Sequence, residues 1–394
     1  DDDRHPLWEL IRWSLTANHE LAEIETLRLA AITLTWVFTA SSCLLRDTAT
    51  KALISIFVNR PQLIPGVLSR FQDVDDLYIM ERICPAVLGV IARYTSGEDI
   101  KASAIAVYQA VSSRQTPQLN INLRDYARAV IEYALQKGCL DESINVDKCR
   151  PPYHSEWPLL DTAKEEIERI AEKSGGRQIL LSALDWGDFA RYEIEPKVHH
   201  FTSIPLDQSK PLNNEERENA FIKELSSWDI EKQKAFENFK SAVEEKNASL
   251  RIETGSGADF HIGFSYSEEK VERAKQSEEI FLSLLREKER KLYEQFMLPV
   301  LVPDKVPYED RTLPVFDANF AKRWVTKKTY EYGWNKDLFP DDRGQHGVAR
   351  DRPRVERIGK KYQWLALFEF MARLTDNVWV IGGWPGRAIV YDHP

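Results

Sequence analysis

The sequence predicts a mostly α-helical protein in two parts. We expect a HEAT- or armadillo-like α-solenoid over residues 1–150 and a C-terminal α+β domain with long amphipathic helices over residues 151–394. Two observations lead to this fold class: a short motif that recurs among helical patterns in the first part, and two long charged segments with sparse apolar stripes in the second. A chain of 394 residues is long enough to bury a sizeable core.

The repeated motif lies in the N-terminal part. "LRDTA" at residues 45–49 returns as "LRDYA" at residues 123–127, seventy-eight positions later, which is close to twice the repeat length of HEAT and armadillo proteins. Small and apolar residues follow each copy at helical spacing, as a packed solenoid helix requires. We expect the Asp of each copy to cap or support a helix N-terminus and the Arg to bridge to a neighbouring repeat.

The second part begins at a proline-rich break, "RPPYHSEWP", after Cys149. A short helix is expected over residues 161–172. The stretch "DWGDFARYEIEPKVHHF" is rich in aromatic and β-branched residues, so we expect a small β element near residues 177–205.

Two charged segments follow, over residues 214–247 and 267–297, and each is expected to form one amphipathic helix or a pair. The connection between them, "LRIETGSGADFHIGFSYS", is typical of a hairpin or loop with Gly255 and Gly257 at its turn. A helical end is predicted near residues 355–377, where Glu369 and Arg373 form an i,i+4 pair.

Composition narrows the function classes. The net charge of −9 and pI near 5.6 provide no general positive field for nucleic acid, so direct nucleic-acid binding is not favoured. The four widely spaced cysteines are interpreted as reduced core thiols of a cytoplasmic protein. Neither a secretory leader nor an apolar run of membrane-spanning length is visible, and the abrupt ends indicate a fragment of a longer protein.

Motifs for catalysis are weak. No G-x-x-x-x-G-K-[ST] sequence is present, which argues against ATP binding by a P-loop. The outline of a metal-dependent nuclease is formed by Asp188 (or Asp185), Glu195 and Lys197, although Pro196 would interrupt the catalytic strand. The pair His199 and His200 would point to opposite faces of a strand, so no metal site is expected there.

Basic and aromatic residues near the C-terminus are candidates for binding. Arg357, Lys360 and Lys361 precede the predicted helix and could pair with Asp317, Asp341 or Asp342, or could bind phosphate. Together with Arg354 they are also the basis of an alternative, a scaffold or nucleic-acid-binding solenoid. Trp and Tyr dominate binding hot spots, so the candidate partner-binding anchors are Trp324, Tyr330, Tyr332, Trp334, Trp379 and Trp384.

Five stretches occur in an order that resembles the C-terminal region of bacterial antiviral STAND NTPases of the AVAST (Avs) type. They are "RDTATKAL", "FQDVDDLYIMERICPAVLG", "DWGDFARYEI", "FDANFAKRWV…YGWNKDLF" and "RVERIGKKYQWLALFEFMARLTDN". The resemblance implies a sensor that binds a conserved phage protein, such as the terminase large subunit or the portal, and thereby triggers oligomerisation through an NTPase domain outside this chain. It also implies a bacterial cytoplasmic location, with ATP and magnesium used only in the absent domains and no catalytic residue or cofactor here.

Overall fold

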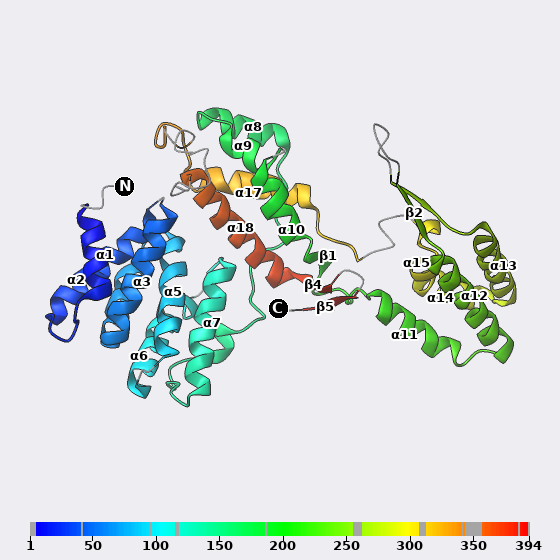
Figure 1. The fold of residues 1–394 in the computed structure, drawn as a ribbon, viewed down its shortest axis with the longest axis horizontal. Helices are drawn as coiled ribbons and strands as arrows, with labels where there is room; N and C mark the ends of the chain where they lie inside the picture. The colour runs from blue at the N-terminus through cyan, green and yellow to red at the C-terminus, as the bar shows by residue number, and fades with distance from the viewer. Residues whose placement is uncertain are drawn as a thin grey trace. The chain divides into compact units, whose positions relative to one another are not determined.

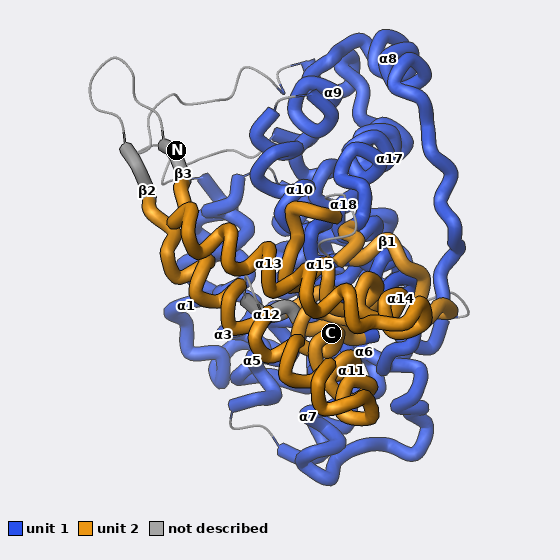
Figure 2. Tube along the Cα trace, turned by 90° about the vertical axis from the view of Figure 1, so that its right-hand side faces the viewer, with its two compact units in different colours: residues 1–201, 316–380, 392–394 blue, residues 202–315, 381–391 orange. Residues whose placement is uncertain are grey.

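The chain folds mostly into α-helices, with a small amount of β-structure. The computed structural model describes residues 5–40, 42–93, 96–114, 118–185, 187–254, 262–306, 313–340, 342, 357–384 and 387–392. Chain contacts divide it into two compact units (Figure 2). Unit 1 comprises residues 1–201, 316–380 and 392–394, and unit 2 comprises residues 202–315 and 381–391. The expected boundary at residue 150 therefore lies inside unit 1.

The N-terminal part of unit 1 consists of helices packed in two rows (Figure 1). One row contains α1 (Pro6–Thr16), α3 (Cys43–Asn59), α5 (Leu77–Ile91) and α7 (Ile121–Gln136), and each contacts the next. The other row contains α2 (Ile24–Trp36), α4 (Ile64–Phe71) and α6 (Gly97–Val107). One continuous apolar cluster fills the space between them. This arrangement has the stacking that a solenoid needs, but the HEAT-like repeat itself stays a prediction.

The rest of unit 1 is also helical. It contains α8 (Lys164–Lys173), α9 (Gln178–Ala183), α10 (Glu195–Val198), α17 (Ala318–Glu331) and α18 (Ile358–Asn377). Helix α17 packs on α8, α9 and α18, and α18 also contacts α7. The helical end predicted near residues 355–377 is confirmed by α18.

The β element expected near residues 177–205 is largely wrong. Helix α9, a π-helical turn (Ala190–Ile194) and α10 occupy most of this range, and only β1 (Phe201–Pro205) is a strand. The physical reason is the spacing of the buried residues: Ala190, Ile194 and Val198 recur every four positions, which places them on one helical face. The sequence-based prediction gave more weight to the aromatic and β-branched residues, which favour strands, than to this four-residue spacing.

The longer segment of unit 2, residues 202–315, leaves and rejoins unit 1 through two connections that pair with each other. Thr202 forms an antiparallel bridge with Val315, and the backbone N–H of Ser203 donates to the carbonyl of Pro314 at 2.7 Å. Strand β1 also belongs to a three-stranded sheet of order β1-β4-β5, with β4 at Val378–Trp384 and β5 at Arg387–Tyr391.

The charged segments form helix pairs in unit 2, as predicted. The first pair is α11 (Asn214–Leu225) with α12 (Ile230–Ala248), and the second is α13 (Glu268–Leu284) with α14 (Glu287–Phe296), followed by the short α15 (Leu298–Leu301). The expected hairpin is confirmed: β2 (Arg251–Thr254) pairs antiparallel with β3 (Ile262–Ser265). Its turn, including Gly255 and Gly257, lies outside the described residues.

The core of unit 2 is a cluster of aromatic rings. Ring centroids of successive partners lie 5.0 to 6.3 Å apart, mostly in tilted or edge-to-face geometry, which favours the aromatic quadrupoles. The members are Phe221, Phe236, Phe239, Phe281 and Tyr293.

Removing one ring from this cluster should destabilise unit 2. We expect Phe281→Ala to lower the free energy of unfolding by about 3–5 kcal/mol, because Phe281 is 0% exposed and its loss leaves a cavity. The adjacent Ile280, which is 60% exposed, supplies the matched control, and Ile280→Ala should change stability by less than about 0.5 kcal/mol. Urea unfolding followed by the 19F NMR signal of Trp228 in 5-fluorotryptophan-labelled protein, assigned with a Trp228→Phe variant, reports on unit 2, since Trp228 packs on Phe221. Equal losses in the two variants would contradict the aromatic core.

Candidate functional site

The basic residues before α18 serve internal contacts more than an exposed surface. Lys361 is buried, and its ammonium lies 2.5 Å from Asp76 Oδ2 and 5.4 Å from the centroid of the Tyr78 ring. Asp76 also caps α5 by accepting from the backbone N–H of Tyr78. Lys361 is therefore removed as a partner-binding residue, and its acid is none of the three expected. Arg357 precedes the first turn of α18 and Lys360 lies half-buried within it.

The glycine of "RIGKKY" has a packing role. A Cβ on Gly359 would lie 2.5 Å from Ile179 Cδ1 and 2.8 Å from Asp342 Oδ2, so a larger residue here would require these two side chains to move. The same Asp342 oxygen accepts from the backbone N–H of Gly359 at 3.1 Å and from Trp334 Nε1 at 2.9 Å. Asp341 and Arg354 lie outside the described residues.

Two of the six predicted aromatic anchors are core residues, and Trp324, Tyr332 and Trp379 are half-buried. Trp334 and Tyr330 are buried, with their rings 5.9 Å apart, which removes both as contacts for a partner on the folded surface. Trp324 is half-buried, and its ring lies 5.2 Å from that of Phe370. The Tyr332 hydroxyl donates to Glu369, which also forms the predicted i,i+4 pair with Arg373 at 2.9 Å.

The residues of the nuclease alternative have separate partners. Glu195 pairs with Lys322, whereas Lys197 pairs with Glu193 at 2.6 Å, four residues earlier on the helix. Asp185 pairs with Lys164 at 3.0 Å. Within the described ranges, no three His, Cys, Asp or Glu side chains are grouped as a metal site requires. Pro196 lies in the first turn of a helix, where its missing N–H is tolerated, and not in the strand that was expected.

The repeated Arg-Asp motif has an equivalent structural role in α3 and α7. Arg46 Nη1 donates to the carbonyl of Ala40, and Arg124 Nε donates to that of Gln118, in each case six residues earlier. The expectation that the Asp caps the helix is wrong. The caps are Ser42 and Asn120, which lie three residues before the N–H groups they accept from. The motif begins inside the first helical turn, too late for its Asp to cap.

One Arg of this motif reaches across to α18. Arg124 Nη1 donates to Asp376 Oδ1 at 2.8 Å, and both side chains are buried. The guanidinium also lies 4.6 Å from the centroid of the Tyr153 ring. Burial raises the pKa of the Asp376 carboxyl, an effect that outweighs the opposing attraction of Arg124. The Arg was visible in the sequence, but its partner lies 252 residues away and no local pattern marks it.

Cavities flank this buried pair. One, of about 300 Å³, is bordered by Arg128 and Met371; another, of about 400 Å³, is bordered by Lys148 and His154, and Arg124 lines both. A third, of about 480 Å³, is lined by the ion pairs that involve Asp185 and Glu195.

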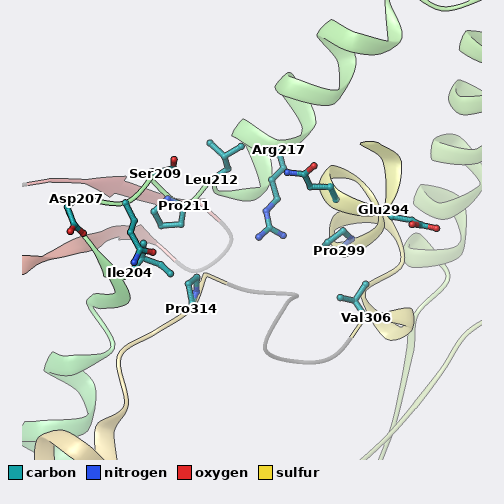
Figure 3. Close-up of a pocket in the computed structure, with 12 residues that line it drawn as sticks. Ile204, Asp207, Ser209, Pro211, Leu212, Arg217, Glu294, Pro299, Val306 and Pro314 are labelled. Carbon is teal, nitrogen blue, oxygen red and sulfur yellow. The ribbon is translucent and has the colours of Figure 1, made fainter. Parts of the chain in front are cut away.

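A larger cavity, of about 900 Å³, lies in unit 2. Figure 3 shows Arg217 of α11 between Pro211 on one side and Pro299 on the other. Its charged lining residues are Asp207, Arg217 and Glu294. The described lining thus holds one cation and two acids, without a convergent set for one ligand or reaction.

Comparison with known proteins identifies no relative. No family model, curated protein or solved structure matches this chain. Among the helices that the structure describes, none combines the length and the apolar character that a membrane span requires.

Breaking the buried pair should have a large cost. We expect Asp376→Asn to lower the free energy of unfolding by about 3–5 kcal/mol, because it leaves Arg124 buried with an uncompensated charge. A double-mutant cycle in urea compares Arg124→Met, Asp376→Leu and the variant that carries both. The double variant should lose less free energy of unfolding than the sum of the losses in these two single variants. Strict additivity would show that the two side chains do not interact in solution.

Burial of Glu81 predicts a pH dependence. The pKa of its carboxyl is raised above the ordinary 4.5 by burial, and hydrogen bonds from Asn120 and Asn122 only partly oppose this. Because the folded state binds the proton more tightly, this contribution to stability is complete below the unfolded-state pKa and is lost as pH rises through the folded-state pKa. The advantage of the wild type over Glu81→Gln should therefore fall with rising pH, by about 1.4 kcal/mol per pH unit between the two pKa values.

Urea unfolding across this pH range measures the difference. Glu25 supplies the control, since Arg28 lowers the pKa of its exposed carboxyl. The advantage of the wild type over Glu25→Gln should change in the opposite direction, being present above the unfolded-state pKa and lost as pH falls. The same sign of pH dependence in both comparisons would contradict the burial of Glu81.

Proposed function

We propose that this chain is the target-recognition region of a bacterial anti-phage STAND NTPase, and that it binds a conserved phage protein, the terminase large subunit or the portal. The resemblance of five ordered motifs supports the family. The paired helix rows of unit 1 support the role, because stacked helix pairs present an extended surface to a macromolecule. Binding triggers oligomerisation through the NTPase domain in the bacterial cytoplasm, and ATP and magnesium act in that domain.

The proposal of a protein partner rests on one observation: several large apolar side chains are exposed at the first helices. Exposed apolar surface is the usual mark of a protein-binding site. Leu29 and Trp36 are seven residues apart on α2, so they lie on the same helical face. The large exposed apolar residues within the first 44 positions are Leu15, Leu21, Ile24, Leu29, Trp36 and Leu44.

Charge supports a protein more than a nucleic acid. The net charge is −9, and Lys361, the central residue of the basic cluster, is engaged by Asp76 inside unit 1. A partner that signals through oligomerisation would bury a large interface, above about 2,000 Å² in total. The nuclease alternative has no specific observation in its favour, since Glu195 and Lys197 pair with different residues.

A matched pair of variants tests the surface. We expect Leu29→Asp to weaken binding to the purified terminase large subunit or portal by about tenfold or more, because a charge replaces an apolar contact in the interface. Leu181 of α9 has the same exposed fraction as Leu29, 51%, and Leu181→Asp should leave the affinity unchanged. Surface plasmon resonance measures both.

Three outcomes would contradict this proposal. Wild-type protein that binds neither phage protein would remove the sensor function, and equal loss in the two variants would remove the first helices as the interface. Magnesium-dependent cleavage of plasmid DNA that Lys197→Ala abolishes would support the nuclease alternative instead.

A further inference from the structure

The cavity of about 400 Å³ in unit 1 is assembled from three separate segments. Ser112 and Arg114 come from the end of the π-helical turn that follows α6 and from the residues just after it, Arg124 comes from α7, and Lys148 and His154 come from the connection that follows α7. This volume lies in the range of small-molecule sites and is far too small for a folded partner. The cavity is distinct from the exposed helices through which the proposed phage protein would bind.

A buried cation forms one wall. Arg124 is 7% exposed and is fixed by three contacts: Gln118 O at 2.5 Å, Asp376 Oδ1 at 2.8 Å and the Tyr153 ring at 4.6 Å. Its Nη2 is buried and has no hydrogen-bond partner in the described structure. A guanidinium that is already oriented loses little rotational freedom on binding a ligand, and its unused N–H donors suit an oxyanion.

The remaining charges of the lining are mostly positive. Arg114 is anchored by the carbonyl of Gln72 and by Asp73, so its position is set as well. Lys148 forms no ion pair with any residue that the structure describes, and His154 is exposed beside it. Asp147 is the one acid in the described lining. Since Asp376 and Asp73 already compensate the two arginines and Asp147 offsets Lys148, the site would recognise an anion through the unused N–H donors of Arg124 and through Lys148, and not through an excess of positive charge.

An irregular helical turn borders the same cavity. Residues Tyr108–Ser112 form a π-helical turn, closed by the N–H of Ser113 donating to the carbonyl of Tyr108 at 2.8 Å. Such turns are rare and occur frequently at functional sites. This turn brings Val111 and Ser112 into the lining, beside the buried cation. The π-helical turn and the buried Arg124 thus both line the cavity of about 400 Å³, which makes this cavity the candidate ligand site.

We propose that this cavity binds a small ligand through a phosphate group. The phosphate lies against Lys148 and His154 at the exposed side and accepts from Arg124 at the buried side. The phosphate can come from inorganic phosphate or from a nucleotide, and the chemistry of the group is the same.

Isothermal titration calorimetry of the whole chain tests the site, with inorganic phosphate, pyrophosphate and AMP as probes and sodium chloride at matched ionic strength as the blank. We expect saturable binding by the wild type, and an affinity at least tenfold lower in Lys148→Glu. Lys51 is an exposed lysine of α3 outside the cavity, and Lys51→Glu changes the net charge equally. It should bind as the wild type does.

His154→Gln supplies a second variant at an exposed position, where loss of folding is not expected, and it should also weaken phosphate binding. Tighter binding of AMP than of phosphate would identify a nucleotide as the source, and equal binding would identify the free anion; both support the site. The proposal is overturned if no phosphate probe binds above the chloride blank, or if Lys148→Glu and Lys51→Glu bind equally. Neither result bears on binding of the phage protein.

Discussion

Two ion pairs, one of them fully buried, hold α18 against the helix rows, and much of unit 1 depends on where that helix lies. Lys361 in its second turn meets Asp76 at the start of α5, and Asp376 in its last turn meets Arg124 at the start of α7. Helix α18 therefore runs across the N-terminal ends of two neighbouring helices (Figure 1). Removing charges from water is costly, so such pairs specify position more than they add net stability.

Internal ion pairing also explains why charged residues that were candidates for catalysis or for phosphate binding do not form such sites. Several of the charged residues that the sequence singles out form ion pairs within unit 1. Lys361 with Asp76 and Glu195 with Lys322 join different segments, whereas Glu369 and Arg373 pair along α18. Side chains engaged in this way are poorly placed to hold a metal or to contact phosphate on the surface. What stays available for recognition is apolar surface at the first helices, together with the few cations that border the cavity beside Arg124.

Local periodicity predicted the elements that depend on it. Helix α18, the two charged helix pairs of unit 2 and the hairpin between them follow from apolar spacing and from turn residues, and the structure has them. The stretch around Ile194 misled because its aromatic and β-branched residues favour strands, whereas tertiary packing selected a helical face. The contacts of the candidate site could not be predicted from the sequence in this way. The partners of Arg124 and Lys361 lie 252 and 285 residues away along the chain, a relation that only the folded structure reveals.

Residues 202–315 leave and rejoin unit 1 at two points that neighbour each other in space. Because residues 202–203 and 314–315 pair as neighbouring strands, the polypeptide leaves and re-enters unit 1 at points about 5 Å apart. The two ends of unit 1 at this point are so close that a tight turn could join them in place of residues 202–315. An unrelated domain with adjacent termini could be grafted at this point, while the helix rows that carry the proposed recognition surface keep their own fold.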